Sequence, residues 1–322
     1  KIKVGILGAT GMVGRHLIAL LQDHPWFEVV AVAASKKSVG KKIGSLTVGS
    51  VEDDIKVISQ KCSFVFSAIE ADKDLIKKIE EDYASAGLPV VSCNSAHRWT
   101  DDVPVIMPEI NPHHLDMISA QKGARGWKTG FIVTKPNCSI QSYVPLLRAW
   151  KDFNPRKVVV STYQAISGAG KTFETWPEMI DNVVPYIGGE EEKSEDEPSK
   201  VLGDMKGNKF ILKKDLLISA NCIRVPVSDG HMATINIQFE KSVSKEELIK
   251  SLKNFKNPLA GLGLPSAPED FILYFEEENR PQTRLDRGLG EGMTISVGRI
   301  REDKVLGWKC VALSHNTIRG AA

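Results

Sequence analysis

A strand that passes through a glycine-rich turn into a helix opens this chain, and it constrains the fold more than any other feature of the sequence. Residues 3–7 are a short apolar run typical of a buried strand, and glycines follow at every third position from 8 to 14. The next segment has the apolar spacing of one helix face, with Val13, Leu17, Leu20 and Leu21. A strand, a tight turn and a helix in this order predict the first unit of a parallel sheet.

The same alternation continues through the first third of the chain. A charged helix is predicted at residues 74–86. Short apolar runs predict further strands at residues 29–34, 63–68, 89–92, 103–107 and 130–134. We therefore expect an α/β domain of Rossmann type, in which a doubly wound parallel sheet has helices on both faces.

The pattern changes after residue 136. Longer strands that helices do not regularly separate are predicted at residues 157–164, 216–225, 232–240, 271–276, 293–301 and 305–314. Helices are predicted at 173–187 and 245–255, and the acidic run 190–197 is interpreted as a solvated loop or face. We expect an α+β catalytic and dimerisation domain at 137–314 with a mixed, mostly antiparallel sheet, and residues 315–322 returning to the first domain of residues 1–136.

Composition excludes several classes of protein. The 42 Lys and Arg residues nearly balance 40 Asp and Glu residues, and a formal net charge of +2 does not suit a nucleic-acid partner. No apolar run reaches the roughly 18 residues that span a bilayer, so we expect no membrane partner. Five cysteines without a CxxC pair argue against a disulfide framework. These features predict a cytoplasmic protein that uses no metal ion.

The glycine turn predicts a dinucleotide site. Gly8, Gly11 and Gly14 lie where a strand becomes a helix, so the backbone can approach a pyrophosphate at the positive end of that helix. The second strand ends in Ser35-Lys36-Lys37-Ser38, without the acid that binds the ribose of NAD. Hydroxyls beside two cations suit a 2′-phosphate, so we predict NADP. The alternatives are a glycine turn that binds nothing and an ordinary exposed basic turn.

A cysteine and a histidine are the candidates for covalent chemistry. Cys138, in Pro136-Asn137-Cys138-Ser139, follows a predicted buried strand and precedes an apolar stretch that can be helical. A helix N-terminus lowers a thiol pKa and supplies N–H donors, so we expect a reactive thiolate with an oxyanion site. His231 follows a glycine turn between two strands and is the candidate partner. The other cysteines are interpreted as buried hydrophobic residues: Cys62, Cys93, Cys222 and Cys310.

Several motifs in one order resemble a known family. They are residues 8–14, Pro136-Asn137-Cys138-Ser139, residues 164–170, Arg224 with His231, and residues 316–322. Together they resemble the aspartate-β-semialdehyde dehydrogenases of the archaeal and fungal branch over nearly the whole chain. The resemblance implies a reversible, NADP-dependent conversion of L-aspartyl 4-phosphate to aspartate semialdehyde in the synthesis of lysine, threonine and methionine, by a homodimer or homotetramer.

The resemblance also implies roles for individual residues. Cys138 matches the thiolate that accepts the acyl group, His231 the acid/base and Gln164 a residue that orients the substrate. Arg224 matches the residue that binds the α-carboxylate, and Glu197-Pro198-Ser199-Lys200 matches a Glu-x-x-Lys motif for the substrate ammonium and phosphate. Arg98 and Asn137 match further phosphate contacts. The cofactor contacts fall on Gly8, Thr10, Gly11, Met12, Val13, Ser35, Ser38, Ser67, Ser167, Gly168 and Asn316.

Two other interpretations stay open at this stage. A malonyl-CoA reductase or an N-acetyl-glutamyl-phosphate reductase would keep the fold and the thioester, but Glu197 favours a substrate that carries an ammonium group. A non-catalytic NADP-binding sensor would not need Cys138, Gln164, Arg224 and His231 together. Residues 38–57 are fewer than the family usually carries there, and relatives are expected to continue past residue 322 into a helix.

Overall fold

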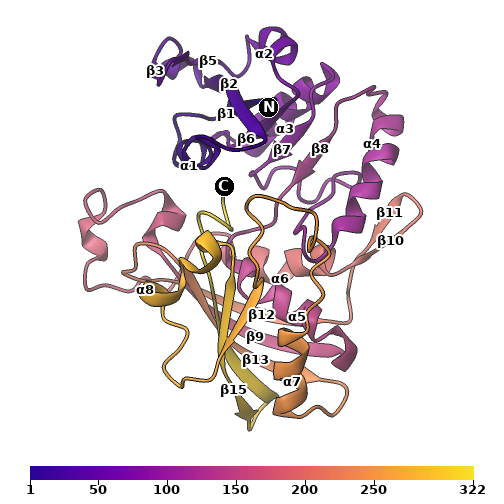
Figure 1. Ribbon diagram of the computed structural model, residues 1–322, viewed down its shortest axis with the longest axis vertical. Helices are drawn as coiled ribbons and strands as arrows, with labels where there is room; N and C mark the ends of the chain where they lie inside the picture. Colours follow the sequence, from indigo (N-terminus) through magenta and orange to yellow (C-terminus); the bar gives the residue numbers. More distant parts are fainter.

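The computed structural model describes residues 1–322, which form two six-stranded sheets one above the other along the long axis (Figure 1). The N-terminal half supplies the upper sheet, and the C-terminal half supplies the lower sheet. The chain end lies between the two sheets in this view. The catalytic candidates come from the connection between the sheets and from the ends of those strands of the lower sheet that point toward the upper one.

The upper sheet is parallel throughout, with the strand order β5-β2-β1-β6-β7-β8. Its strands are β1 (Ile2–Leu7), β2 (Phe27–Ala34), β5 (Gly49–Ser50), β6 (Phe64–Ser67), β7 (Val90–Ser92) and β8 (Ile132–Thr134). Its helices are α1 (Met12–Leu21), α2 (Ile55–Lys61), α3 (Lys73–Ser85) and α4 (Met117–Arg125). The predicted Rossmann-type sheet is confirmed.

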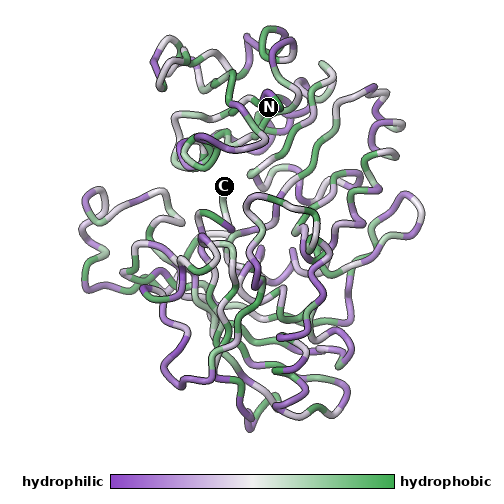
Figure 2. The backbone as a smooth tube through the Cα atoms, viewed as in Figure 1, coloured by the Kyte–Doolittle hydropathy of each residue, from purple (hydrophilic) through white to green (hydrophobic).

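Separate hydrophobic cores cover the two faces of the upper sheet. One contains Leu17 and Leu21 of α1, and the other contains Ile58 of α2 with Ile79 and Tyr83 of α3. Figure 2 shows green, hydrophobic stretches in the upper half of the molecule. A parallel sheet needs helices on both faces because its strands are apolar on both sides.

The glycine turn has a steric reason for each of two glycines. Gly8 has a φ of +81°, and a Cβ there would lie 2.1 Å from the carbonyl oxygen of Ala68. A Cβ on Gly14 would lie 2.2 Å from the carbonyl oxygen of Gly8. A side chain at position 14 would therefore push α1 away from the end of β1, and one at position 8 would push that end away from the residues that follow β6.

The lower sheet is mixed, with the strand order β12-β9-β13-β16-β15-β14. The central pairs are antiparallel, whereas β12 with β9 and β14 with β15 are parallel. Its strands are β9 (Pro155–Gln164), β12 (Leu217–Arg224), β13 (His231–Phe239), β14 (Ile272–Phe275), β15 (Ile295–Asp303) and β16 (Gly307–Ser314). The predicted mixed, mostly antiparallel sheet is confirmed.

At β9, only one face of the lower sheet is covered by its own chain. The helices α5 (Val144–Ala149), α6 (Glu190–Val201) and α7 (Lys245–Lys253) contact this sheet or the core beneath it. On β9, Val158 and Val160 are buried in that core, but Val159 between them is 42% exposed. Two short hairpins, β3 (Lys42–Ile43) with β4 (Leu46–Thr47) and β10 (Asp204–Lys206) with β11 (Lys209–Ile211), lie outside both sheets.

Two predicted elements are wrong. The segment 173–187 contains only a 3₁₀ turn, Pro177–Met179, because Pro177 and Pro185 interrupt helical hydrogen bonding. The segment 103–107 is not a strand but a single bridge, in which Val105 pairs with Thr134 of β8.

The acidic run is also different from the prediction. Residues 190–197 are the first two turns of α6, not a loop, and three acids in the first turn suit the positive end of that helix. Ser194 and Glu197 are buried, so this part of the run is not solvated. The other predicted helix of this half, residues 245–255, is confirmed as α7.

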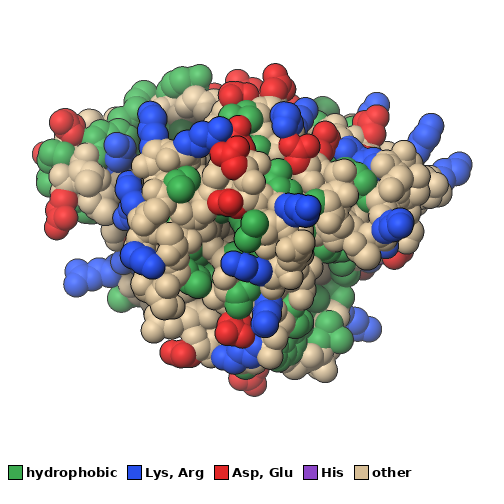
Figure 3. Space-filling view, turned by 90° about the horizontal axis from the view of Figure 1, so that it is seen from above, with side chains coloured by type: hydrophobic (Ala, Val, Ile, Leu, Met, Phe, Trp, Pro, Cys, Tyr) green, Lys and Arg blue, Asp and Glu red, His purple; other side chains and the backbone are tan.

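The surface of the upper domain is charged, and the chain end is packed against the rest of the protein. Seen from above, the upper domain carries basic and acidic side chains intermingled on one face (Figure 3). No helix has the length and apolar character that a membrane span requires. At the chain end, Ala322 packs against the core that contains α1, and Arg319 forms a buried ion pair with Glu109.

Candidate active site

Cys138 lies in the connection between the two sheets, just after β8. It precedes a short 3₁₀ turn, Ser139–Gln141, which leads toward α5. The side-chain oxygen of Asn137 accepts hydrogen bonds from the backbone N–H and the hydroxyl of Ser139, at 2.8 and 2.6 Å. Asn137 thereby fixes the turn that presents the thiol.

His231 is the partner of this thiol. Its Nε2 lies 3.6 Å from Sγ of Cys138, although the two residues are 93 positions apart. The histidine is the first residue of β13 and is fully buried, and its Nδ1 accepts a hydrogen bond from the backbone N–H of Ala165 at 3.1 Å. Burial, and next the charge of Arg224, lower the pKa of His231 to about 3, so the imidazole is neutral.

The resting thiol differs from the prediction. Burial, and next the negative charge of Glu190, raise the pKa of Cys138 to about 11, against the opposing cations of Lys135, Arg98 and Arg224. The expected lowering by a helix N-terminus is wrong because Cys138 precedes only a one-turn 3₁₀ segment, whose dipole is small. The thiol is therefore protonated near neutral pH in the absence of ligands.

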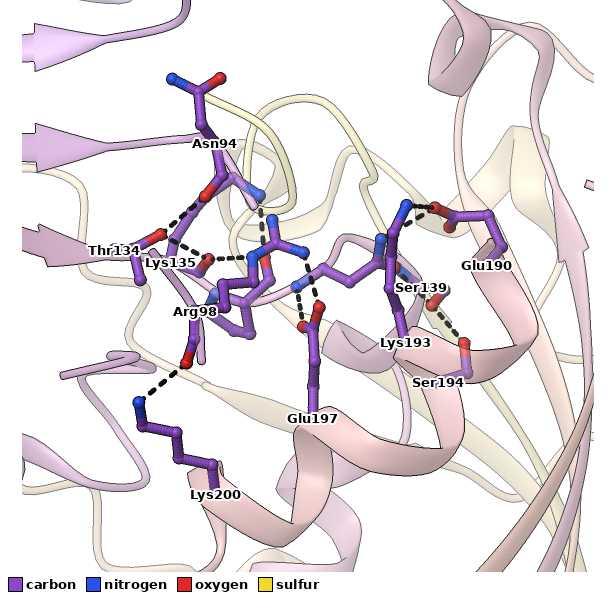
Figure 4. Close-up of polar contacts among 12 residues, drawn as sticks. Asn94, Arg98, Thr134, Lys135, Ser139, Glu190, Lys193, Ser194, Glu197 and Lys200 are labelled. Carbon is purple, nitrogen blue, oxygen red and sulfur yellow. Dashed lines mark hydrogen bonds and ion pairs between the residues drawn. The ribbon is translucent and has the colours of Figure 1, made fainter. Parts of the chain in front are cut away.

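Glu190 joins the polar groups around the thiol. One carboxylate oxygen accepts hydrogen bonds from the side chains of Asn137 at 3.0 Å and Lys193 at 2.9 Å, and the other accepts from Gln164 at 3.4 Å. Gln164 is the last residue of β9, and Glu190 and Lys193 form the first turn of α6. Figure 4 shows the contact between Glu190 and Lys193.

Arg224 ends β12 on the other side of the pair. Its Nη1 donates to the carbonyl oxygen of Ala165 at 2.6 Å. A Cβ on Gly168 would lie 2.8 Å from that nitrogen and 3.1 Å from the ring of His231, so only glycine fits between them. Burial lowers the pKa of Arg224, but a guanidinium remains charged at any physiological pH.

A second cluster holds Arg98 and Glu197. Nη1 of Arg98 pairs with Glu197 at 2.7 Å, and Nε donates to the carbonyl oxygen of Lys135 at 3.0 Å. The second oxygen of Glu197 accepts the backbone N–H of Asn137 at 2.7 Å. Both side chains are almost fully buried, and Figure 4 shows how the ion pair bridges α6 and the loop before the thiol.

Lys200 is fully engaged within the chain. Its ammonium donates to the carbonyl oxygens of Arg98 at 2.8 Å, Thr100 at 3.2 Å and Val103 at 2.9 Å. Only 4% of the residue is exposed, and burial lowers its pKa to about 8. An ammonium group has three protons, so no donor remains for a ligand in this arrangement.

The predicted cofactor residues lie on both domains. No side chain caps α1 after Gly11, and the N–H groups of Met12 and Val13 have no partner in the chain. Such free donors at a helix N-terminus suit a pyrophosphate. The hydroxyls of Thr10 and Ser38 lie 3.5 Å apart at the end of β2, and exposed Lys36 pairs with Asp53, while Lys37 has no ion-pair partner.

The other cofactor candidates surround this cradle. Ser67 at the end of β6 accepts a hydrogen bond from Asn94 at 3.2 Å. In the lower domain, Asn316 donates to Ser167 at 2.9 Å and accepts from the backbone of Gly230, beside His231, at 2.7 Å. A Cβ on Gly170 would lie 4.0 Å from Sδ of Met12, so the glycine turn and residues 166–170 face one another.

Three residues near the thiol were missed in the sequence. Glu190, Lys193 and Lys135 all lie within electrostatic reach of Cys138 or of its polar neighbours. The available signal was the motif Glu190-Glu191-Glu192-Lys193, which repeats the Glu-x-x-Lys spacing of Glu197 and Lys200 seven residues earlier. The structure brings five predicted residues together at one site: Cys138, His231, Gln164, Asn137 and Arg224.

A Rossmann-type domain joined to a mixed-sheet domain, with a thiol and an imidazole in contact between them, defines a two-domain dehydrogenase with a cysteine nucleophile. Residues 3–118 match the family model "Semialdehyde dehydrogenase, NAD binding domain", and residues 145–319 match "Semialdehyde dehydrogenase, dimerisation domain". The chain belongs to the aspartate-semialdehyde dehydrogenase family.

Individual relatives match over the whole chain. An aspartate-semialdehyde dehydrogenase of Archaeoglobus fulgidus is 44% identical, covering 100% of this chain and 95% of the relative. That of Saccharomyces cerevisiae is 39% identical, covering 99% of this chain and 94% of the relative. A crystal structure of the Candida albicans enzyme with NADP is similar with a TM-score of 0.87 and 36% identity, covering 100% of this chain and 95% of that one.

Proposed function

We propose that this protein catalyses the reversible, NADP-dependent reductive dephosphorylation of L-aspartyl 4-phosphate to L-aspartate 4-semialdehyde, in lysine, threonine and methionine biosynthesis. The observation that carries the proposal is the 3.6 Å contact between Sγ of Cys138 and Nε2 of His231. Family membership over the full chain supports the same substrate. The carboxylate of Glu190 beside the thiol favours a substrate with an ammonium group over malonyl groups, which have none.

Cys138 is the nucleophile. Its thiolate attacks the acyl phosphate, the carbon–oxygen bond to phosphate breaks, and a thioester remains on the sulfur. NADPH, when bound, supplies the hydride that reduces this thioester. Collapse of the resulting oxyanion breaks the carbon–sulfur bond, releases the aldehyde and restores the thiolate. Once ionised, the cysteine begins and ends each reductive turnover as an anion, and the departing phosphate takes up one proton from solvent.

His231 stabilises negative charge in this scheme. Because Nδ1 accepts the N–H of Ala165, the neutral ring carries its proton on Nε2, the nitrogen that faces Sγ. A donor at that position stabilises the thiolate and the oxyanion by hydrogen bonding. We therefore propose His231 as a hydrogen-bond donor to the sulfur and the oxyanion, in place of the acid/base role that the resemblance implied.

The substrate's two charged ends suit Arg224 and Glu190. Arg224 uses one nitrogen of its guanidinium on Ala165, which leaves the rest of the fork for the α-carboxylate. Glu190 and Gln164 then hold the α-ammonium and orient the substrate. Besides burial, the charge of Glu190 keeps the pKa of Cys138 high. An ammonium group paired with Glu190 offsets that charge, so substrate binding promotes ionisation of the thiol.

The phosphate suits Arg98, Asn137 and Lys193. Nη2 of Arg98 makes no hydrogen bond within the chain, and Lys193 is half-buried beside Asn137 and Glu190. Lys200 and Glu197 match the family motif in sequence, but their contacts support a different role. We propose that they hold Arg98 and the turn before Cys138 in place, rather than touch the phosphate themselves.

The cofactor is NADP, by the fit of the chain's own residues. Free N–H groups after Gly11 suit the pyrophosphate, and Ser35, Lys37 and Ser38 suit the 2′-phosphate. The remaining contacts are proposed for Gly8, Thr10, Met12, Val13, Ser67, Ser167, Gly168 and Asn316. The proposed cofactor contacts of one domain face those of the other domain beside the thiol.

A second copy of the chain completes the protein. The uncovered face of the lower sheet, with Val159 exposed on β9, lies in the region that matches a dimerisation domain. We propose a homodimer through this face, or a tetramer built from such dimers, located in the cytoplasm, where five free cysteines stay reduced. The proposed division places residues 1–136 and 315–322 in the cofactor domain and 137–314 in the catalytic domain.

A comparison of substrates tests the function. The purified protein is expected to reduce NADP in the presence of phosphate and aspartate semialdehyde. It should do so far more slowly with malonate semialdehyde and CoA, or with N-acetylglutamate semialdehyde and phosphate. Cys138→Ser should lower kcat by at least about a thousandfold because a serine alkoxide is scarcely populated. The control Cys93→Ser should retain most activity. Turnover that survives in Cys138→Ser would contradict the mechanism, and absence of turnover in the wild type would favour the sensor.

A further inference from the structure

A fully buried carboxylate lies near the carboxyl ends of the strands of the upper sheet. Glu80 of α3 is 0% exposed, and its one potential cationic partner is His97, whose Nε2 lies 3.9 Å from Oε2 of Glu80. The proposed mechanism uses neither residue. A buried carboxylate is costly unless its oxygens are bonded, so its contacts require an explanation.

One oxygen of Glu80 joins the carboxyl ends of neighbouring strands. Oε1 accepts the hydroxyl of Ser92, at the end of β7, at 2.7 Å and the amide of Asn94 at 2.9 Å. The same amide donates to Ser67 at the end of β6, and the carbonyl oxygen of Asn94 accepts the hydroxyl of Thr134 at the end of β8. Figure 4 shows this last contact beside the ion pair of Arg98.

The other oxygen of Glu80 faces the imidazole of His97. Oε2 of Glu80 and Nε2 of His97 are both buried without a hydrogen-bond partner. Nδ1 of His97 contacts the hydroxyl of Thr100 at 3.1 Å, so the ring is fixed at its other side. Two unpartnered polar atoms that face each other at 3.9 Å become hydrogen-bonded after a movement of about 1 Å, if they share one proton.

His97 is adjacent in the chain to Arg98. Several contacts hold the loop 97–103: Lys200 binds three of its carbonyl oxygens, and Arg125 pairs with Asp102. The Lys200 contacts fix the backbone on the side of α6. Glu80 faces the imidazole of His97 from α3, on the side of the upper sheet.

We propose that Glu80 and His97 are positioning residues, a buried carboxylate–imidazole pair that anchors the loop 97–103 so that Arg98 presents its guanidinium to the phosphate. The inference rests on the proposed role of Arg98. The pair shares one proton between Nε2 and Oε2, and neither group touches substrate. Through Asn94, the same carboxylate ties this loop to Ser67, so the anchor spans the cofactor and phosphate sides of the site.

Hydrogen exchange tests the anchor without turnover. Glu80→Leu and His97→Leu are expected to raise the exchange rates of the amides in residues 97–103 by about tenfold or more, because the loop loses one of its attachments. Glu80→Gln, which keeps the acceptor for Ser92 and Asn94, should raise them less. The control is Asp82→Asn on the same helix, whose carboxylate pairs with exposed Lys78 and does not contact the loop. Unchanged exchange in His97→Leu overturns the anchor, even if Glu80→Leu fails to fold.

Kinetics then distinguish positioning from general stability. The KM for phosphate should rise about tenfold in His97→Leu and Glu80→Leu, with less than about a twofold change in the KM for NADP, and the double variant should resemble the single ones. A uniform loss of kcat with unchanged KM values would show a structural role only and overturn the proposal. If the wild type does not turn over aspartate semialdehyde, the proposed function fails, but the exchange result still decides whether the pair anchors the loop.

Discussion

The backbone N–H of Ala165 donates a hydrogen bond to Nδ1 of His231 over 3.1 Å, and this contact assigns the proton of the neutral ring to Nε2. Nε2 is the atom that faces Sγ of Cys138. With ¹⁵N-labelled histidine, the Nδ1 signal of His231 is expected to be that of an unprotonated ring nitrogen and the Nε2 signal that of a protonated one, from pH 5 to 8. His231→Asn identifies the signal. A protonated Nδ1 would mean that the imidazole is arranged as a base toward the thiol.

The pH dependence of thiol alkylation follows from the burial of Cys138 and from the charges around it. Its pKa of about 11 means that the thiolate fraction grows tenfold with each pH unit below that value. Iodoacetamide modification of Cys138, followed by mass spectrometry, should therefore accelerate steadily from pH 7 to 10 in the ligand-free protein. A plateau by pH 8 would contradict the raised pKa.

Glu190 should account for part of that raised pKa. Glu190→Gln removes a negative charge beside the thiol, which lowers the pKa of Cys138 and should speed its alkylation at pH 8 by roughly five- to tenfold. Glu192→Gln is the matched control, because it makes the same change of charge at an exposed position of the same helix turn. Equal rates in the two variants would remove Glu190 from the electrostatic argument.

The two lysines of α6 should separate binding from stability. Lys193→Met is expected to raise the KM for phosphate by about tenfold and leave the free energy of unfolding nearly unchanged, since Lys193 is half-buried with one partner. Lys200→Met removes three hydrogen bonds from a buried ammonium and should lower the free energy of unfolding in urea by about 2–4 kcal/mol. The opposite pattern would return the phosphate contact to Lys200.

The sequence could not distinguish these two lysines. Both Glu190 with Lys193 and Glu197 with Lys200 have the Glu-x-x-Lys spacing, and the pairs are seven residues apart. Seven residues are close to two helix turns, so both pairs lie on nearly one face of α6, about 10 Å apart along its axis. Only the packing of α6 on β12 decides which pair reaches the thiol and which reaches the loop of Arg98.

The parallel sheet and the mixed sheet were predictable because their strands are apolar runs of characteristic length. The failed helix at 173–187 has apolar residues at helical spacing, but Ile180, Val183 and Tyr186 are more than half exposed. Apolar spacing indicates a buried face only when the chain itself covers that face, and these side chains are not covered by it. Conversely, α6 escaped prediction because its buried face is polar, with Ser194, Glu197 and Lys200.

The cofactor preference should depend on Lys37. This lysine follows β2 beside the hydroxyl of Ser38 and has no ion-pair partner, whereas Lys36 pairs with Asp53. Lys37→Glu should raise the KM for NADP about tenfold or more by repulsion of the 2′-phosphate, with little change in the KM for NAD. Lys41→Glu, a second exposed lysine on the same segment, is the control. Equal effects on both cofactors would place the 2′-phosphate elsewhere.

A buried ion pair attaches the end of the chain. Arg319 binds both carboxylate oxygens of Glu109, at 2.8 and 2.9 Å, and its guanidinium lies 4.7 Å from the ring centre of Phe271. Both side chains of the pair are nearly fully buried. Arg319→Ala leaves a buried carboxylate without its partner and should lower the free energy of unfolding by about 3–5 kcal/mol.

A double-mutant cycle tests this ion pair. Glu109→Ala should cost a similar amount, and the double variant should be more stable than the sum of the single changes predicts by about 2 kcal/mol, because it leaves no unpaired charge. Arg319→Lys should restore little, since one ammonium cannot reproduce two parallel hydrogen bonds. Urea unfolding measures the free energy of unfolding of the wild type and of these four variants. Strict additivity would show that Arg319 and Glu109 do not stabilise each other, and that the chain end is held by the packing of Ala322 instead.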